Sequence, residues 1–492
     1  MSSFKGTYVL FLFYVFILFG CEKKQGAKEF IRPNILWINA DDLGRELACY
    51  GNPDVKTPNI DKLAQQGTLY TNAYANAPVC SASRSSLITG MYPTTVNCLD
   101  HRTINMTLLP NDIKPITEYF KEAGYFIANG SGKDYLKKGG KNDYNFIPNI
   151  KYDGKDWNER AEGQPFFAQV QIKYPHRVFE RHKKNAINAE TVKLPECYPD
   201  HPLLKADWAL YLESVQKCDD IVGWVMQRLE DEDLADNTVV FFFGDHGRPH
   251  LRDKQFLYEG GLQIPLIIRW PEKVETNKID DRLVSLVDVS ATTLNISGLE
   301  IPYKLHGKVF IGHKQEKRDY VYGFRGRAGD APDAIRSITD GHFKLIWNQE
   351  PEKPWMQLSS YKRAEYPAFA LYRVLYEKGE LQAPFNQFMA DNRPEFEFFD
   401  LKNDPNEFNN LTNDSDYQGH FDELKSILQE NLKVYDKNRI PESEETIQKG
   451  MEGSQNYFKI KMKKLGLAEE ITDEELLAYW NKTLLKTKAG NY

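Results

Sequence analysis

The sequence has few cysteines, six in 492 residues, and no two of them form a Cys-x-x-Cys pair. This excludes a disulfide-dense scaffold and leaves no thiolate set for a structural zinc ion. The sequence also lacks an excess of basic charge, since 63 Lys and Arg residues stand against 70 Asp and Glu residues, for a net charge of -7. Because binding to nucleic acid requires a basic surface that neutralises phosphates, we expect no nucleic-acid partner.

Long apolar runs are scarce as well, and the longest spans only residues 8–19. It follows Lys5 and is too short for a good transmembrane helix, which needs about 20 residues, so it is typical of an export signal. Gly20 and Cys21 end the run and resemble a bacterial lipobox, which predicts cleavage before Cys21 and lipidation of that residue. We therefore expect an exported chain, lipid-anchored to the cell envelope in the periplasm or at the outer membrane surface. An ordinary signal peptide with a chance cysteine is the alternative.

Several short apolar runs predict buried strands, at residues 34–40, 166–172, 238–243 and 266–270. Helical patterns lie between these runs, at residues 57–64, 116–124 and 208–229. Strands that alternate with helices predict an α/β fold with a mostly parallel sheet flanked by helices.

The pattern changes beyond residue 310. An Asp-Gly pair within residues 337–346 predicts a hairpin, and residues 397–401 predict one more short strand. We therefore expect a smaller C-terminal antiparallel α+β subdomain beside the main sheet. The predicted divisions are a lipoprotein signal peptide at 1–20, a linker at 21–32, the main α/β domain at 33–310, the subdomain at 311–440 and a charged helical extension at 441–492.

Polar residues directly follow three of the predicted strands. Asp41 and Asp42 follow the first, His176 comes after the second, and Asp245 and His246 come after the third. Because ligands bind beyond the carboxyl ends of parallel strands, we expect these side chains to converge at one edge of the sheet. A group of carboxylates without thiolates suits Ca²⁺ or Mg²⁺. Taken alone, the aspartate pair is also compatible with a helix N-cap, and the Asp-His-Gly segment with a solvated turn.

A cysteine, Cys80, precedes a predicted helix within residues 78–90, and Arg84 follows four positions later. The free N–H groups and the dipole of a helix N-terminus stabilise anions, and an arginine adds a bidentate donor. A nucleophile at this position would face an anion site. The alternative is a small cysteine buried in the core, which is the usual fate of a single one.

The segment Cys-Ser-Ala-Ser-Arg at 80–84, followed by Ser-Ser-Leu-Ile-Thr-Gly, resembles the Cys-x-(Pro or Ala)-x-Arg signature of type I sulfatases. Further segments are similar to that family in the same order, at residues 34–42, 50–64, 244–247, 254–265 and 399–411. Tyr-Pro-His-Arg at 174–177 is similar to the sulfamidase-like branch, and bacterial members of similar type act on algal polysaccharides such as ulvan. The resemblance implies an alkaline-phosphatase-like fold with the catalytic chemistry in the domain at 33–310.

The resemblance implies two additions to the chain. A formylglycine-generating or anaerobic sulfatase-maturating enzyme would oxidise Cys80 to formylglycine (3-oxoalanine). Ca²⁺ would then be bound by the modified Cys80 together with Asp41, Asp42, Asp245 and His246. Family members vary at the last ligand, so His246 is within the pattern.

The resemblance also implies roles in the hydrolysis of a sulfate ester on a sulfated carbohydrate. Arg84 and Lys133 would hold the formylglycine hydroxyls, and Asp245 would help to deprotonate the attacking one. His176 would donate a proton to the departing sugar oxygen, and Lys254 would bind the sulfate.

One position departs from the family pattern Gly-Lys-x-His, because Tyr135 stands where a histidine would assist the release of sulfate. Either this tyrosine serves, or His101 replaces the missing histidine. We also expect His101, Arg102 and Arg177 to bind substrate, although the first two are equally compatible with an ordinary loop pair.

Three other functions remain compatible with the sequence. The first is a phosphate or phosphonate ester hydrolase of the same superfamily, and the second is an N-sulfoglucosamine sulfohydrolase. The third is a glycan-binding lipoprotein on an inactive enzyme scaffold, which predicts the loss of a metal ligand or of the cysteine. All of those positions are filled here, which favours the sulfatase.

Overall fold

The predicted buried strands lie side by side in a seven-stranded sheet with the order β4-β6-β1-β7-β8-β2-β9. β1 (Asn34–Asp41) pairs in parallel with β6 (Phe166–Pro175) and with β7 (Thr238–Gly244). β4 (Phe126–Gly130) extends the sheet beyond β6, again in parallel. Every residue of β1 is buried, which explains its continuous apolar sequence, because helices cover both faces of this sheet.

One strand is the exception to this parallel arrangement. β8 (Gln263–Arg269) is antiparallel to β7 and to β2 (Thr68–Tyr74), whereas β9 (Lys278–Ser285) is parallel to β2. The connection from β7 to β8 carries only the short helix α5 (Glu259–Leu262), which does not take the chain back across the sheet. β8 therefore starts near the carboxyl end of β7, and the sheet is mostly, but not wholly, parallel.

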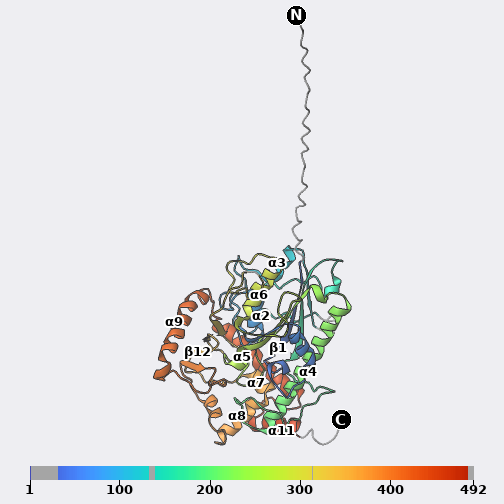
Figure 1. Cartoon of the computed structure of the whole chain (residues 1–492). Helices are drawn as coiled ribbons and strands as arrows, with labels where there is room; N and C mark the ends of the chain where they lie inside the picture. Colours follow the sequence, from blue (N-terminus) through green and yellow to red (C-terminus); the bar gives the residue numbers. More distant parts are fainter. Residues whose placement is uncertain (2–31, 132–138, 313, 486–492) are drawn as a thin grey trace. The chain divides into compact units, whose positions relative to one another are not determined.

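Helices cover the two faces of the sheet and fill two hydrophobic cores (Figure 1). Ile35 and Trp37 of β1 point into one core, and Leu36 and Ile38 point into the other, as the alternation of a strand requires. The helices of the first core are α2 (Cys80–Thr89), α3 (Ile116–Glu122) and α6 (Leu286–Ile296). Those of the second core are α1 (Pro58–Gln65) and α4 (Pro202–Asp231).

Helix α2 is wholly buried although most of its residues are polar. Two of its hydroxyl groups are satisfied within the helix, because Ser85 and Thr89 each donate to the carbonyl oxygen four residues earlier at 2.7 Å, and the hydroxyl of Ser83 donates to the carbonyl oxygen of Asp245. Gly90 ends the helix in the left-handed conformation, with φ of 66°. The helix can therefore stand in the core with no side exposed to solvent.

The predicted C-terminal antiparallel subdomain is confirmed as a second sheet of four strands. Its strands, in order, are β10 (Val321–Arg325), β11 (Ile335–Thr339), β12 (Phe343–Asn348) and β13 (Phe396–Asp400). The predicted hairpin joins β11 to β12 through Asp340 and Gly341, and Gly341 has φ of 89°, which favours glycine. Helix α9 (Gln418–Tyr435) packs against this sheet, beside β12 in Figure 1.

Four more helices belong to the C-terminal part of the chain: α7 (Ser360–Glu365), α8 (Pro367–Glu377), α10 (Glu444–Lys464) and α11 (Asp473–Leu485). α10 packs against α7, and α11 packs against α8 and α4. The two-stranded pair of β3 (Thr107–Leu108) and β5 (Phe146–Ile147) is also present. Short 3-10 helices lie at Ala48–Tyr50, Trp157–Glu159, Ala235–Asn237, Phe385–Met389 and Ser415–Tyr417.

The computed structural model describes residue 1 and residues 32–131, 139–312 and 314–485. Cys21, Lys133 and Tyr135, to which three of the predictions refer, lie outside the described residues. Pro33–Tyr492 form one compact unit that contains both sheets, so the boundaries predicted at 310 and 440 stay predictions. Within the described residues, no helix is both long and apolar enough to cross a bilayer, and the cysteines found there are free.

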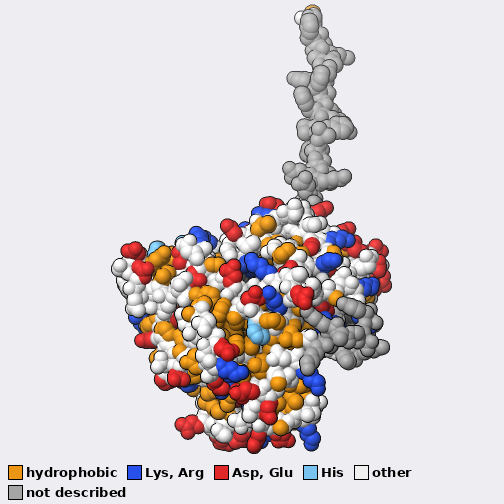
Figure 2. Space-filling view, turned by 90° about the horizontal axis from the view of Figure 1, so that it is seen from below, with side chains coloured by type: hydrophobic (Ala, Val, Ile, Leu, Met, Phe, Trp, Pro, Cys, Tyr) orange, Lys and Arg blue, Asp and Glu red, His pale blue; other side chains and the backbone are white. Residues whose placement is uncertain are grey.

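Charged side chains of both signs are interspersed on the face shown in Figure 2. Hydrophobic side chains lie between them, and a histidine stands near the centre of this face. The mixture agrees with the mild net charge of -7. On this face, attraction of an anion must therefore come from local groups rather than from a uniform field.

Candidate active site

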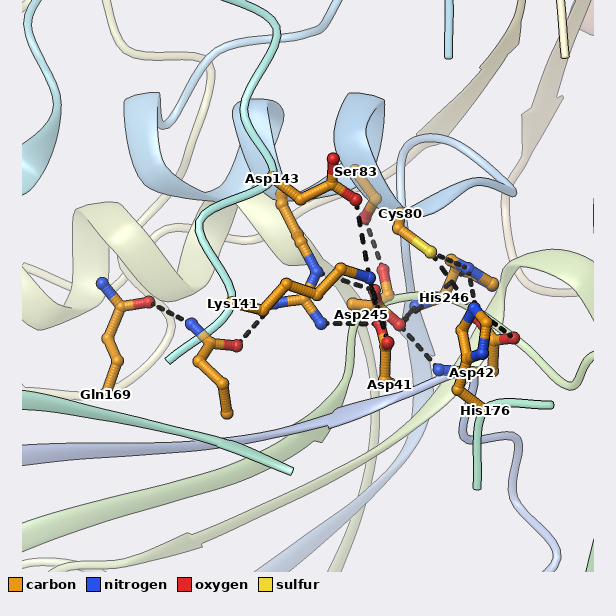
Figure 3. A network of polar contacts seen from close by, with 12 residues as sticks. Asp41, Asp42, Cys80, Ser83, Lys141, Asp143, Gln169, His176, Asp245 and His246 are labelled. Carbon is orange, nitrogen blue, oxygen red and sulfur yellow. Dashed lines mark hydrogen bonds and ion pairs between the residues drawn. The ribbon is translucent and has the colours of Figure 1, made fainter. Parts of the chain in front are cut away.

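The carboxyl ends of β1 and β7 bring three aspartates together (Figure 3). The pairing of β1 with β6 shifts in register between Ala40 and Asp41, and Asp42 has φ of 64°, a left-handed conformation that is strained in a non-glycine residue. The N–H of Asp42 donates to Oδ1 of Asp245 at 2.9 Å, which holds this turn in place. As a result, one carboxylate oxygen of each aspartate lies within 4.8 Å of the other two, and all three residues are buried.

Cys80 is the first residue of α2 and lies beside these carboxylates, with 1% of its surface exposed. Its Sγ is 3.4 Å from Nε2 of His246, and 3.7 Å from both Oδ1 of Asp42 and Nζ of Lys254. No side chain caps the helix at Val79, so the N–H groups of the first turn can serve an anion next to Cys80. The cysteine therefore lies at a helix N-terminus, as the sequence indicated.

Two buried cations hold the carboxylates in place. Arg84 donates through Nη2 to Asp41 at 2.8 Å and through Nε to Asp245 at 2.9 Å. Lys254 places its Nζ 2.7 Å from each carboxylate oxygen of Asp42. Pairing of this kind is required at such depth, because a buried carboxylate without a partner costs several kcal/mol, roughly 3–5.

Lys141 is a site residue that the sequence did not reveal. Its Nζ lies 2.8 and 2.9 Å from the two carboxylate oxygens of Asp41, which it reaches from the loop after β4. The only local signal is the glycine pair before it: a Cβ on Gly140 would lie 2.2 Å from Oδ1 of Asn129, so only glycine fits that close approach. That signal explains the path of the chain but assigns no role to the lysine. The lysine implied by the resemblance, Lys133, lies outside the described residues.

These contacts shift the pKa values of the site in different directions. Burial raises the pKa of Asp245 to about 7, although Arg84 opposes this effect. Burial would also raise the pKa of Asp41, but Lys141 and Arg84 together hold it well below its usual value. The thiol of Cys80 behaves like Asp41, because Lys141 and neighbouring cations outweigh burial and lower its pKa. The site therefore stabilises negative charge at the position of Cys80.

The donor set fits a divalent cation. Four groups meet beside Cys80, the carboxylates of Asp41, Asp42 and Asp245 and the imidazole of His246. Nδ1 of His246 lies 2.9 Å from the carbonyl oxygen of Gly247, and Nε2 lies 2.9 Å from Oδ1 of Asp42. Burial lowers the pKa of His246, but the charges of Asp245 and Asp42 outweigh it and raise this pKa to about 10, and a bound cation would take the place of the proton on Nε2. Donors that are mostly oxygen suit Ca²⁺ or Mg²⁺.

Two more histidines approach the same point. Nε2 of His176, directly after β6, lies 3.8 Å from Oδ2 of Asp42. A ring nitrogen of His101 lies within 4.8 Å of both Sγ of Cys80 and the carboxylate of Asp143. Burial lowers the pKa of His101, whereas for His176 the charge of Asp42 outweighs burial and raises the pKa. The structure thus brings His101 next to Cys80. A histidine at this position is what the family pattern requires, and this chain has Tyr135 in place of the usual one.

Arg102 lies at the edge of the site, with 55% of its side chain exposed. Its backbone N–H donates to Oγ of Ser81 at 2.9 Å, which ties this loop to the first turn of α2. Its guanidinium pairs with Asp143 at 3.0 Å. Because an exposed ion pair contributes only about 0–1 kcal/mol, an anionic ligand can compete with Asp143 for this guanidinium.

The contacts of Arg177 lend no support to its predicted role in binding substrate, which stays a prediction. Its guanidinium forms a double hydrogen bond with the carboxylate of Asp207 on α4, and Nε donates to the carbonyl oxygen of Pro249 at 3.0 Å. Only 4% of the Arg177 side chain and 6% of the Asp207 side chain are exposed. Sequence alone does not distinguish an arginine that faces a ligand from one that is buried against a distant carboxylate.

Replacing Arg177 with methionine is therefore expected to affect stability first. The change leaves the carboxylate of Asp207 buried with only His250 nearby, at 3.7 Å, so the free energy of unfolding should fall by about 3–5 kcal/mol. Urea denaturation measures this loss. The double variant R177M/D207L should recover most of it, because it removes both charges; a single variant as stable as the parent would contradict the assignment.

Comparison with known proteins agrees with this geometry. The sulfatase family model matches residues 33–146 and 126–299, and the model for the C-terminal part of N-sulphoglucosamine sulphohydrolase matches residues 244–356. An ulvan-active sulfatase of Formosa agariphila is 32% identical, over 86% of this chain and 78% of that protein.

Solved structures share the fold at low sequence identity. A 2-O GAG sulfatase is 17% identical and superposes with a TM-score of 0.61, covering 85% of this chain and 96% of that one. A phosphonate monoester hydrolase of Agrobacterium radiobacter is 18% identical with a TM-score of 0.59, covering 81% of this chain and 96% of that one. These likenesses identify an alkaline-phosphatase-like fold, whereas the family match and the ulvan-active relative identify the activity. The chain belongs to the sulfatase family and is a sulfuric ester hydrolase.

Proposed function

We propose that this sulfatase removes sulfate from a sulfated polysaccharide, for example algal ulvan, or from its oligosaccharides, with Ca²⁺ and a formylglycine formed from Cys80. The observation that carries this proposal is the position of Cys80, at a helix N-terminus and 3.4–3.7 Å from His246, Asp42 and Lys254. The substrate class is supported by the relative from Formosa agariphila, which is named an ulvan-active sulfatase.

In the proposed mechanism, formylglycine and Ca²⁺ have different roles from the other side chains of the site. Hydrated formylglycine at position 80 would supply two hydroxyl groups on one carbon, one for attack on sulfur and one for the release of sulfate, and Ca²⁺ held by Asp41, Asp42, Asp245 and His246 would polarise the first. Asp245, which Arg84 holds among the carboxylates at the end of β7, would accept the proton of the attacking hydroxyl. Lys254 and Lys141 neutralise the sulfuryl oxygens as negative charge moves toward the leaving group.

The charge balance of the site supports an anionic substrate. Among the contacts described, Arg84, Lys141 and Lys254 are paired with Asp41, Asp42 and Asp245. These charges cancel, so a bound divalent cation would leave the site positive. A sulfate monoester carries a single negative charge and would offset half of that excess, which favours its binding in a buried site.

Two histidines with opposite pKa shifts suit the two proton transfers. The raised pKa of His176 keeps a proton available for the departing sugar oxygen. The lowered pKa of His101 keeps its imidazole neutral, so it can accept the proton of the second hydroxyl as sulfate is released. We therefore propose His101 in the role that the family pattern gives to the histidine replaced by Tyr135.

The competing chemistries and the location of the enzyme belong to the same proposal. Phosphonate ester hydrolysis is supported only by a likeness of fold at 18% identity. Hydrolysis of N-sulfoglucosamine is favoured by the match at residues 244–356 and is the second candidate. We propose export and lipid anchoring at Cys21, with the site facing sulfated glycans outside the cytoplasm.

The test is co-expression with a maturating enzyme, followed by mass spectrometry of the peptide that contains Cys80 and by sulfate release from a substrate panel. The panel contains ulvan oligosaccharides, N-sulfoglucosamine, an aryl sulfate and an aryl phosphate. The expected result is an aldehyde at position 80 and sulfate release from the ulvan oligosaccharides. An unmodified thiol in active enzyme would overturn the mechanism, and release from N-sulfoglucosamine alone would replace the substrate.

Removal of the metal should lower both activity and stability. Without the cation the buried carboxylates lose a partner, so dialysis against EGTA should lower the melting temperature and reduce sulfate release to background. At a Ca²⁺ concentration of about 1,000 Kd, binding contributes about 4 kcal/mol to stability. Thermal melts and sulfate assays measure the two effects, and EGTA already saturated with Ca²⁺ is the control. A chelated enzyme that melts and turns over unchanged would contradict the proposed site.

A further inference from the structure

Two tyrosine hydroxyls beside the site have no hydrogen-bond partner among the described residues. They belong to Tyr361 on α7 and to Tyr366, the residue after that helix, and both oxygens are buried. Their rings lie 5.7 Å apart. A buried hydroxyl without a partner costs about 1–3 kcal/mol, so such groups are expected to meet a ligand or water in the working enzyme.

Tyr361 stands next to the position of the reacting group. Nζ of Lys254 lies 5.6 Å from the centre of its ring, and the same atom lies 3.7 Å from Sγ of Cys80. The charges of Asp42 and Cys80 act on its hydroxyl and, together with burial, raise its pKa. Tyr361 is therefore close to the space that a sugar would occupy once its sulfate reached Cys80.

A second aromatic ring continues from Tyr361 toward solvent. Tyr457 on α10 lies 6.2 Å from Tyr361, measured between ring centres, and 40% of its surface is exposed. Its hydroxyl donates to Glu365 at the end of α7, and Nζ of Lys461 contacts the same carboxylate at 2.7 Å. These two contacts fix α10 against α7, so the position of the Tyr457 ring is set by the packing of two helices.

We propose that Tyr361 and Tyr457 bind the sugar ring that carries the scissile sulfate. The apolar C–H face of a pyranose packs on the aromatic rings, and the hydroxyl of Tyr361 exchanges a hydrogen bond with a hydroxyl group of the same sugar. The inference rests on the proposed sulfatase function and extends it, because it assigns the recognition of the sugar to α7 and to the C-terminal helix α10. Arg102, exposed at the edge of the site, is available to a further anionic group on that saccharide.

The first test measures binding without turnover. In Cys80→Ala protein, calorimetry with a sulfated ulvan oligosaccharide gives the Kd, and Tyr361→Phe and Tyr457→Ala are added to that background. Each is expected to weaken binding about tenfold, Tyr361→Phe through one lost hydrogen bond and Tyr457→Ala through the lost ring contact. Tyr376→Phe and Tyr376→Ala on α8, where 46% of the residue is exposed, are the matched controls and should leave the Kd unchanged. An unchanged Kd in both test variants would overturn the inference.

The second test uses turnover and separates recognition of the sugar from the chemistry. In enzyme with Cys80 intact, the ratio of kcat/KM for the oligosaccharide to kcat/KM for an aryl sulfate should fall about tenfold in each variant, mainly through KM. An equal fall for both substrates would indicate a structural role and would also overturn the inference. A parent enzyme that binds the oligosaccharide through these tyrosines but releases no sulfate would contradict the proposed function and leave this subsite supported.

Discussion

Replacing Cys80 with alanine is expected to lower sulfate release by on the order of 10⁵-fold, because in the proposed mechanism this residue supplies the attacking hydroxyl. Cys80 lies between His246, Asp42 and Lys254, all within 3.7 Å of its Sγ, and its pKa is lowered by that setting. The effect should appear in kcat rather than in KM, since the cations that bind sulfate remain. Release of sulfate from ulvan oligosaccharides under single-turnover conditions measures it.

The matched control for this variant is Cys49→Ala. Cys49 is also free, but it is only partly buried and lies in a 3-10 helix near α1. We expect its replacement to leave kcat unchanged, and both proteins should melt within a few degrees of the parent. Residual activity of the Cys80 variant above about one per cent of the parent would show that another group attacks sulfur.

Replacing Lys254 with alanine is expected to lower kcat by about 10²- to 10³-fold, the cost of losing one preorganised charge at a developing anion. Nζ of Lys254 lies 2.7 Å from each oxygen of Asp42 and 3.7 Å from Sγ of Cys80, so it links a proposed metal ligand to the proposed nucleophile. Its loss removes positive charge next to the sulfuryl group and frees Asp42 to move. Steady-state kinetics with an oligosaccharide and with an aryl sulfate should show the same loss, because both substrates present the same sulfate.

Lys344 provides the control for burial of an ammonium group. It is fully buried between Glu259 and Glu407 on the second sheet, at 2.5 and 3.1 Å from their carboxylate oxygens. Lys344→Ala should therefore lower the melting temperature much as Lys254→Ala does, while the folded fraction keeps the kcat of the parent. If Lys254→Ala and Lys344→Ala lower kcat equally, the loss of activity in Lys254→Ala comes from reduced stability and not from a missing charge in the transition state.

The groups at strand ends could be predicted because their signal is local. An apolar run that ends in one or two aspartates marks both a buried strand and the place where its side chains leave the core, as at Asp41, Asp42 and Asp245. Parallel pairing then brings separate strands to one edge, which needs no knowledge of contacts. The antiparallel direction of β8 could not be predicted in this way. It results from a connection after β7 that contains no helix crossing the sheet, and the apolar pattern of a strand carries no information about its direction.

Lys141 and the two tyrosines proposed to bind the sugar come from segments with no chemical pattern of their own. Lys141 contacts a carboxylate exactly one hundred positions earlier in the chain, and Tyr361 and Tyr457 come from helices whose sequence indicated no chemistry. Arg177 gives the opposite case, since its neighbour His176 faces the site while its own guanidinium is buried against α4. Such placements depend on contacts between segments that are far apart in the chain, and no local sequence pattern predicts those contacts.

The burial of α2 has a consequence for the timing of synthesis. Cys80 exposes 1% of its surface, and every residue of its helix is buried. Under the proposed mechanism an enzyme has to reach the thiol of Cys80 to oxidise it, and in the folded protein that thiol is out of reach. The proposed conversion is therefore expected to happen on the nascent or newly made chain, before the core closes. Protein that has already folded with a thiol should stay inactive when the maturating enzyme is added later, and should become convertible only after it is unfolded.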